Sequence, residues 1–147
     1  MSRTIFLSIS IVLFLAHDAC SQPGVSSVQL NVSGARSDQG KILCSLFREG
    51  MGYPDQPDLA YFKTSFVIAQ GKGAVRIVNI PAGQYAIAIL HDENGDNKMN
   101  TSLLGLPTEG YGFSNNVMGL FGPPGFSKAS FQVASGENKQ LLITLRY

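Results

Sequence analysis

Residues 74 to 90 read AVRIVNIPAGQYAIAIL, and this stretch decides the fold that the sequence predicts. Ala74 to Ile80 places alternate side chains on opposite faces, as a β-strand does. Pro81-Ala82-Gly83 is typical of a tight turn, because proline fixes φ and glycine accepts a positive φ. Gln84 to Leu90 then leaves the turn as the most apolar strand of the chain. The stretch therefore predicts strand, turn and strand, the pattern of a β-rich domain.

Five more segments have the short apolar or alternating patterns of β-strands. They are 28–32 (VQLNV), 41–47 (KILCSLF), 65–69 (SFVIA), 129–134 (ASFQVA) and 139–146 (KQLLITLR). We expect 65–69 and 74–80 to form a hairpin, and 58–64 to form a helical turn or to cross one end of the fold. Seven short strands with Gly/Pro turns predict an all-β domain, a single seven-stranded antiparallel β-sandwich, with a small barrel as the alternative.

Length and charge limit the classes of function. The 147 residues suffice for one domain with its own core, and eleven basic against ten acidic side chains give a formal charge of +1. The chain also has no Lys/Arg cluster of the kind that nucleic-acid-binding proteins carry. We therefore expect no nucleic-acid partner and no electrostatic steering toward anionic membranes.

The N-terminus has the pattern of a secretory signal peptide. Arg3 forms a short basic region, and Ile5 to Ala16 (IFLSISIVLFLA) is apolar but too short to span a bilayer. Small residues in Ala19-Cys20-Ser21 predict cleavage before Gln22. We expect residues 1–21 to be a signal peptide and residues 22–147 to be the β-sandwich domain, periplasmic or secreted, with no transmembrane helix after cleavage. A buried N-terminal helix or strand is the alternative.

Cysteine usage depends on that cleavage. Acylation of Cys20 after cleavage at Ala19 would make a lipoprotein, but His17 and Asp18 stand where such signals usually carry an aliphatic and a small residue. Soluble export is therefore favoured. Cys44 is then the single cysteine of the exported domain, which must fold without a disulfide. Its position in an apolar strand indicates a buried thiol and not a reactive one.

A long connection follows the most apolar strand, from His91 to Phe126: HDENGDNKMNTSLLGLPTEGYGFSNNVMGLFGPPGF. It has neither helical nor strand periodicity, yet its leucines and aromatics argue against disorder. A connection of this length in a compact domain is commonly functional. We therefore expect one long ordered loop and place the candidate site in it.

Oxygen-bearing side chains recur at every second position at the start of this loop. The segment is similar to the first nine positions of a calcium loop of the EF-hand or dockerin type. Its predicted ligands are Asp92, Asn94, Asp96, the Lys98 carbonyl and Asn100. Position six is Asn97 where glycine is usual, and position twelve is Leu103 where an acid is usual. Glu109 is the candidate for the missing carboxylate, which predicts weak calcium affinity, roughly 10⁻⁴ M or poorer. The alternative is a metal-free turn in which Asp and Asn cap backbone amides.

Two further hypotheses concern the same loop. His91, Asp92 and Glu109 could act together as the acid/base set of a small hydrolase or lyase, although no Ser or Cys nucleophile stands in an activating motif near them. The loop aromatics could bind a sugar ring or a peptide, or they could form a small core that packs the loop onto the domain. These aromatic candidates are Tyr111, Phe113, Phe121 and Phe126.

Three motifs carry a family resemblance: IPAGQYAIAILHDENGDN, LGLPTEGYGFSNN and FGPPGF. They closely resemble the domain of unknown function 2141 family of small exported bacterial proteins, over roughly Val28 to Tyr147. More distantly, Pro81, Gly83 and Tyr85 are similar to a turn of transthyretin-like and carboxypeptidase-regulatory-like sandwiches. The resemblance implies a prealbumin-like sandwich and no particular activity. The chain departs from the family motif at Asp96-Asn97, where Asn-Gly or Asp-Gly is frequent.

These observations lead to one expected function and two alternatives. We expect an exported, non-enzymatic β-sandwich module whose long loop binds calcium and presents a binding surface. A peptide, a sugar or an envelope protein is the expected class of partner. The alternatives are the small hydrolase or lyase described above and a purely structural envelope protein.

Overall fold

The computed structural model describes residues 24–147, so the predicted signal peptide and Cys20 lie outside the described residues. The described chain forms eight strands and three short helical turns. The strands are β1 (Ser26–Ser33), β2 (Lys41–Phe47), β3 (Phe62–Phe66), β4 (Gly73–Ile80), β5 (Gly83–Asp92), β6 (Gly110–Phe113), β7 (Phe131–Val133) and β8 (Asn138–Thr144), and the helical turns are η1 (Pro57–Leu59), η2 (Ser114–Asn116) and α1 (Phe126–Ala129). The all-β prediction is confirmed, with eight strands where seven were expected. Within residues 24–147, no helix is long and apolar enough to cross a membrane.

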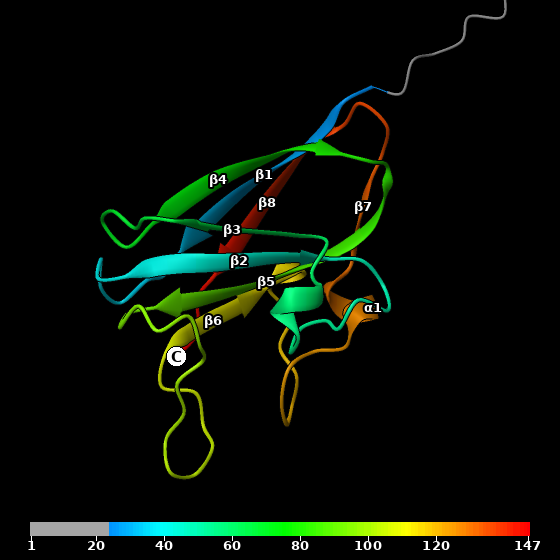
Figure 1. Ribbon diagram of the computed structural model, residues 1–147. Helices are drawn as coiled ribbons and strands as arrows, with labels where there is room; N and C mark the ends of the chain where they lie inside the picture. The colour runs from blue at the N-terminus through cyan, green and yellow to red at the C-terminus, as the bar shows by residue number, and fades with distance from the viewer. Residues whose placement is uncertain (1–23) are drawn as a thin grey trace, which may run out of the picture.

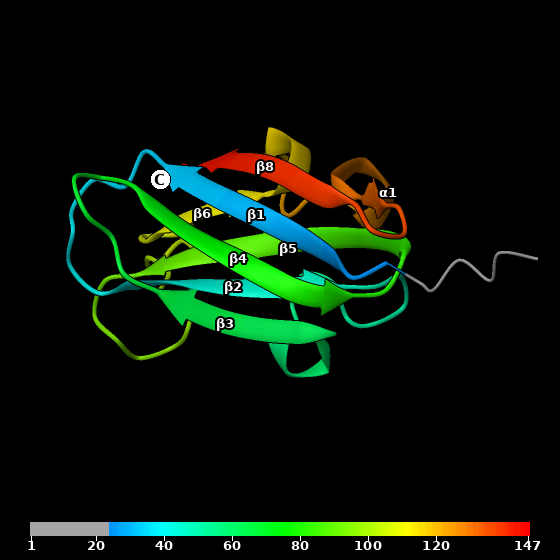
Figure 2. The same cartoon turned by 90° about the horizontal axis from the view of Figure 1, so that it is seen from above.

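The strands are arranged in two sheets that lie over each other (Figures 1 and 2). The three-stranded sheet has the order β4-β1-β8. The five-stranded sheet has the order β3-β2-β5-β6, and β7 pairs with the first residues of β5. β2 and β5 pair along their whole common length, from Lys41↔Asp92 to Phe47↔Ala86. The most apolar strand predicted from the sequence is therefore central in the larger sheet.

The pairing of β1 with β8 is parallel, from Ser27↔Asn138 to Ser33↔Thr144. The prediction of a purely antiparallel arrangement is wrong at this pair. Parallel neighbours need a long connection between them. Here the rest of the described chain supplies it, because β1 is its first strand and β8 its last.

The expected hairpin of 65–69 with 74–80 is also wrong. β3 ends at Phe66 and pairs with β2 in the five-stranded sheet, whereas β4 pairs with β1 in the three-stranded sheet. The segment between them crosses from one sheet to the other through a turn at Gln70 and Gly71, whose backbone amides donate to the Asp38 carboxylate at 2.8 Å each. These two hydrogen bonds hold the crossing against the loop after β1.

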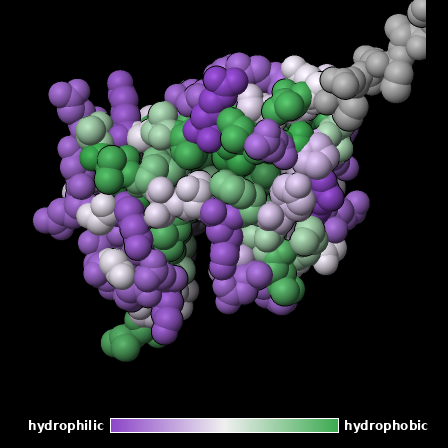
Figure 3. All heavy atoms as spheres, turned by 45° about the horizontal axis from the view of Figure 1, so that its top comes forward, coloured by the Kyte–Doolittle hydropathy of each residue, from purple (hydrophilic) through white to green (hydrophobic). Residues whose placement is uncertain are grey.

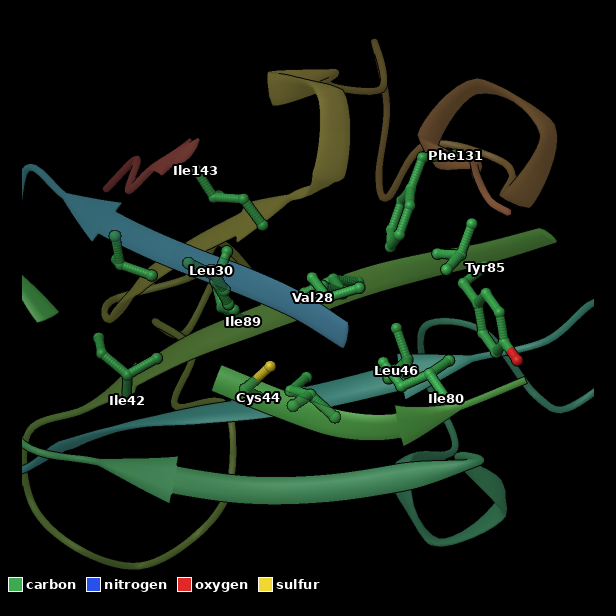
Figure 4. Packing of buried hydrophobic residues seen from close by; sticks show 14 of the residues in the cluster. Val28, Leu30, Ile42, Cys44, Leu46, Ile80, Tyr85, Ile89, Phe131 and Ile143 are labelled. Carbon is green, nitrogen blue, oxygen red and sulfur yellow. The ribbon is translucent and has the colours of Figure 1, made fainter. Parts of the chain in front are cut away.

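One hydrophobic core lies between the two sheets (Figure 4). Val28, Leu30 and Ile143 come from the three-stranded sheet and face Ile42 and Ile89 of the five-stranded sheet. Burial of such side chains is the main favourable term in folding. Cys44 lies in this core with 1% of its surface exposed. Burial raises the pKa of its thiol to about 12, so the thiol stays protonated and chemically quiet, as its strand position predicted.

A second hydrophobic cluster covers the outer face of the five-stranded sheet. Side chains alternate along β5, so Tyr85, Ile87 and Ile89 face the main core while Ala86 and Ala88 face outward. On these alanines pack Phe113, Ala129, Tyr53, Tyr111, Val117 and Phe126. The small alanine side chains leave room for the aromatic rings. The second half of the long loop is thereby attached to the sheet.

β6 is the strand that the sequence patterns did not predict. It lies inside the long loop and pairs with β5, from Ala88↔Phe113 to His91↔Gly110. Its sequence, GYGF, contains two glycines and is too short to show a strand period. Gly112 is required by close packing, since a Cβ there would approach the Ile143 side chain to 2.7 Å.

Candidate functional site

Two projections extend from the five-stranded sheet on the side away from the three-stranded sheet (Figure 1). We call residues 93–109 the first loop and residues 117–125 the second loop. β6 and η2 lie between them in the sequence. Figure 3 shows a notch that separates the projection on the left from the one on the right. The residues of the predicted site are distributed between the buried bases and the exposed ends of these loops.

Asp92 closes the turn at the start of the first loop. It is the last residue of β5 and is completely buried. Its Oδ1 accepts a hydrogen bond from the backbone N–H of Gly95 at 2.9 Å, and its Oδ2 accepts one from Asn97 at 3.2 Å. The Lys41 ammonium lies 3.9 Å from Oδ2. Both carboxylate oxygens are thus engaged in ordering the loop, which is the capping role of the metal-free alternative.

Glu109 closes the other end of the same turn. Only 4% of its surface is exposed. Its Oε1 accepts from the backbone N–H of Glu93 at 3.0 Å, and its Oε2 accepts from Asn100 at 3.1 Å. The predicted return of Glu109 to the calcium-like segment does occur in the structure. Its oxygens, however, bind the backbone at both ends of that segment.

Three polar side chains converge on the exposed side of the turn. The Asp96 carboxylate accepts hydrogen bonds from the side-chain amides of Asn94 and Asn100, at 3.1 and 3.0 Å, and from the Lys98 backbone N–H at 2.9 Å. The amide of Asn100 is the first cause of the lowered pKa of Asp96. Asn97 has a φ of 62°, the left-handed conformation that glycine adopts most easily. The backbone therefore follows the course expected of a calcium loop at this position.

The donor set fits calcium only in part. The side chains of Asn94, Asp96 and Asn100 converge, but the amide groups of Asn94 and Asn100 donate to the Asp96 carboxylate, and Asn94 Oδ1 accepts from the Asp96 backbone N–H. Asp92 and Glu109 are engaged with backbone amides. Among residues 24–147, no group of three or more His, Cys, Asp or Glu side chains lies close enough together to hold a metal ion. Calcium binding stays a prediction. The hydrogen bonds described above order the turn without a metal ion.

His91 is buried between the sheets and serves as a structural hydrogen-bonding group. Its Nε2 lies 2.9 Å from the carbonyl oxygen of Gln39, which only accepts, so Nε2 carries the proton. Its Nδ1 then accepts from the Tyr147 hydroxyl at 2.6 Å. That hydroxyl accepts in turn from the Arg36 backbone N–H at 3.0 Å. Gly110 is glycine because a Cβ would come within 2.5 Å of the Tyr147 ring.

A charged pair covers this network from the solvent side. The Arg36 guanidinium donates from Nε to Glu93 Oε2 at 3.0 Å, and from Nη2 to the Thr108 carbonyl at 2.9 Å. It also lies 4.5 Å from the centre of the Tyr147 ring, a cation–π distance. The Arg36 hydrogen bond lowers the pKa of Glu93, to which the Ser37 hydroxyl adds a second bond. The loop after β1 is thereby fastened to both ends of the first loop.

The four aromatic candidates occupy different environments. Phe113 is buried, and Tyr111 and Phe126 are partly buried in the second hydrophobic cluster. Tyr53 lies between them, with its ring centre 6.2 Å from that of Phe113 and 5.8 Å from that of Phe126. Phe121, in contrast, is fully exposed in the second loop. The structure thus places three of the candidates in the small core and one in solvent.

Four exposed leucines close to Phe121 or in the first loop were not among the predicted site residues. Leu103, Leu104 and Leu106 extend into solvent from the end of the first loop, and Leu120 lies beside Phe121 in the second. Figure 3 shows hydrophobic residues at the end of the left projection. A signal was present in the sequence, because residues 99–108 combine three leucines with turn residues and contain no charged residue. We call these five side chains the loop tips.

The end of the first loop is a short hairpin. Thr101 and Pro107 form an isolated bridge. The Ser102 N–H donates to the Leu106 carbonyl at 2.8 Å, and the Gly105 N–H donates to the Ser102 carbonyl at 2.9 Å. At its base, the Thr108 N–H donates to the Asn100 carbonyl at 2.9 Å. The leucines are therefore displayed on a hydrogen-bonded turn.

The fold and these loops define a small two-sheet β-protein that exposes apolar residues on two ordered loops at one end. The chain belongs to the domain of unknown function 2141 family, described as uncharacterized protein conserved in bacteria, whose model matches residues 30–141. No curated protein and no solved structure matches the chain.

Proposed function

We propose that this protein is an exported, non-enzymatic binding module whose loop tips form the binding surface. The exposure of Leu103, Leu104, Leu120 and Phe121 at one end of the molecule carries this proposal. Large apolar side chains gathered on an exposed surface mark interaction sites in soluble proteins.

The ordered bases of the loops support the proposal. Asp92 and Glu109 hold the start and the end of the first loop through four backbone amides. Phe126 and Val117 attach the second loop to the outer sheet face through the second hydrophobic cluster. A binding surface that is ordered before binding loses less conformational entropy when a partner arrives.

The placement of the acid/base candidates weighs against the hydrolase or lyase. A general acid or base must come within hydrogen-bond reach of the substrate, directly or through one water. His91 and Asp92 are completely buried and Glu109 is nearly so, and each is hydrogen-bonded within the protein. These contacts give all three residues a structural role, which favours a binding module.

The purely structural alternative expects the whole loop to be packed. Phe113 and Phe126 fit that description, but the loop tips do not, because five large apolar side chains stand in solvent. Leaving so much apolar surface exposed is unfavourable unless something covers it. The exposed loop tips therefore favour a binding module over a purely structural protein.

Calcium is the cofactor that the first loop would take. Asn94, Asp96 and Asn100 would hold it, together with Asp92, the Lys98 carbonyl and Glu109 if these exchange backbone hydrogen bonds for the ion. Its role would be to add order to the loop and not to supply chemistry. The convergence of the Asn94, Asp96 and Asn100 side chains supports this part of the proposal.

The proposal also includes a prealbumin-like fold and export through residues 1–21. The two packed sheets and the turn at Pro81 and Gly83 support the fold, with β6 as an eighth strand. Mass spectrometry of the protein from the periplasm or medium of an expressing bacterium tests the export. Cleavage before Gln22 is expected, whereas an acylated Cys20 at the new N-terminus would contradict soluble export.

The binding surface is tested by co-sedimentation with bacterial envelope fragments. The eight described strands begin at Ser26, so the protein without residues 1–21 is used. We expect the double variant Leu104→Ser with Phe121→Ser to bind at least about tenfold more weakly than the unchanged protein, because each lost side chain forfeits roughly 1.5–3 kcal/mol of burial.

The matched control is Val67→Ser with Leu142→Ser, which removes two exposed apolar side chains away from the loop tips. This control is expected to sediment like the unchanged protein. Equal sedimentation of all three proteins, or none at all, would contradict the proposed function.

A further inference from the structure

We propose that the partner of the loop tips is a lipid bilayer, into whose interfacial layer both tips insert. This inference rests on the proposed function, because it names the partner of the same surface. It follows from four properties of the loops: their lack of charge, their flanking lysines, their internal hydrogen bonds and their separation.

The tips have the composition of interfacial membrane anchors. Residues 99–108 and 110–127 contain no charged residue, and Glu109 between them is buried. Charged side chains are strongly unfavourable at membrane depth, whereas leucine and phenylalanine are favourable there. Segments of apolar residues without charges at the exposed ends of loops therefore match the chemistry of the lipid interface.

Lysines flank the two loops. Lys98 precedes the uncharged part of the first loop and Lys128 follows that of the second, and both are exposed. Asp96, the acid nearest to Lys98 in the sequence, is engaged with the amides of Asn94 and Asn100 and with the Lys98 backbone. Exposed ammonium groups at the ends of the two uncharged segments can pair with the phosphates of lipid headgroups.

The backbone of the first tip is partly hydrogen-bonded within the loop, which lowers the cost of placing it in a medium with little water. A polar group that enters the lipid without a hydrogen bond is costly, so irregular backbone must be satisfied internally. The amides of Ser102, Gly105 and Leu106 all donate within the hairpin, to the Leu106 carbonyl, the Ser102 carbonyl and the Ser102 hydroxyl. In the second loop, Pro123 and Pro124 carry no N–H at all.

The separation of the tips favours a bilayer over a protein partner. The five exposed side chains stand on two separate loops and do not form one continuous apolar face. This surface is also divided by a notch (Figure 3). A protein partner would need a surface with two pockets complementary in shape to the two loops, whereas lipid chains can rearrange around two separate projections.

The net charge of +1 indicates how strongly binding should depend on the charge of the lipid headgroups. It provides little long-range attraction to an anionic surface, so binding depends mainly on the apolar tips. We expect vesicles of phosphatidylethanolamine with a minor share of phosphatidylglycerol to bind the protein. Pure phosphatidylcholine should bind it more weakly, by about fivefold for each lysine that loses an anionic contact.

Tryptophan fluorescence tests insertion directly, because the sequence contains no tryptophan. Leu104→Trp and, separately, Phe121→Trp each place one reporter at a tip, and Val67→Trp places the control at an exposed position away from the tips. On addition of vesicles, both tip reporters are expected to shift to shorter wavelength and to become quenched by lipid-borne quenchers. The Val67→Trp reporter is expected to show neither effect.

Vesicle sedimentation separates this inference from the proposed function. The unchanged protein without residues 1–21 should bind vesicles made of lipid alone, and the Leu104→Ser, Phe121→Ser variant should bind at least about tenfold more weakly. Binding to envelope fragments without binding to lipid vesicles would overturn the bilayer and leave the proposed function standing with a protein or cell-wall partner. Equal shifts of the tip and control reporters would overturn the inference as well.

Discussion

Glu109 and Asn100 are joined across the base of the first loop, where Glu109 Oε2 accepts a hydrogen bond from the Asn100 backbone N–H at 3.1 Å. The other carboxylate oxygen accepts from Glu93 at 3.0 Å. One buried side chain thus connects Glu109, at the end of the first loop, with two backbone positions in its first half. Loss of the Glu109 side chain should therefore have a measurable effect on the stability of the protein and on the order of the first loop.

Glu109→Ala is expected to lower the free energy of unfolding by about 2 kcal/mol, because two backbone amides lose a charged acceptor. Urea denaturation measures this loss. The first loop should also become sensitive to limited proteolysis at its leucines while the sheets stay protected. Glu49→Ala, in an exposed turn, is the control and should change neither quantity. Comparable effects of the two substitutions would contradict the role given to Glu109.

Tyr147→Phe is expected to destabilise the protein by about 1–2 kcal/mol, since the buried Nδ1 of His91 loses its donor. The ¹⁵N chemical shifts of the imidazole should place the proton on Nε2 in the unchanged protein, as the bond to the Gln39 carbonyl requires. Tyr61→Phe serves as the matched control, because Tyr61 is exposed to a similar extent and its hydroxyl makes no hydrogen bond within the described residues. A proton on Nδ1 in the unchanged protein would refute the network.

The pair of Arg36 and Glu93 predicts a pH-dependent contribution to stability. Its hydrogen bond lowers the pKa of Glu93 below the ordinary value of 4.5. A lowered native pKa means that the stabilisation is complete above about pH 4.5 and disappears as the pH falls through the native pKa. The difference in unfolding free energy between the unchanged protein and Glu93→Gln should therefore be largest near pH 7. It should be small, because solvent screens the exposed Arg36 side chain, and it should fall as the pH is lowered through the native pKa of Glu93.

A double-mutant cycle with Arg36→Met isolates this pair. The coupling between Arg36→Met and Glu93→Gln should be present at pH 7 and absent at low pH. A coupling that is the same at both pH values would assign the effect to packing of the Arg36 side chain on Tyr147 instead of charge.

The calcium hypothesis predicts a rise of the melting temperature by a few degrees at about 1 mM calcium relative to EDTA, as expected for a dissociation constant of roughly 10⁻⁴ M. Asp96→Ala should abolish the rise and leave the EDTA melting temperature nearly unchanged, because Asp96 is exposed. Asp92→Ala with Asp96→Ala should abolish it too but lower the EDTA value, since Asp92 caps the loop. No rise at millimolar calcium would contradict the metal site.

Much of the fold could be predicted from local patterns. The alternation in β1 and the apolar runs of β2 and β5 indicated the strands that form the core, and Cys44 was expected to be buried there. Leu30, Cys44 and Ile87 in these strands are all buried. The turn before Tyr85 was also expected. In the candidate site, the polar spacing after His91 pointed correctly to an ordered turn, and it named Glu109 as the residue that returns to it. These are features that neighbouring residues specify among themselves.

Other features depend on contacts between distant segments. The parallel pairing of β1 with β8 and the separation of β3 from β4 into different sheets are decided by how the two sheets pack. β6 becomes a strand only because β5 offers it an edge. Strand periodicity carries no information on partner choice, since many pairings satisfy the same alternation.

The sequence by itself determined the all-β class, the identity of the core strands and the presence of an ordered polar turn after His91, because side-chain period and turn chemistry act over a few residues. Only the tertiary structure decided the roles within the site. It turned Asp92, Glu109 and His91 into internal hydrogen-bonding groups by burying them, and it left Leu104 and Phe121 in solvent on two loops that extend from the same end. Burial and exposure of a loop residue follow from what packs against it, and that is settled by the whole fold.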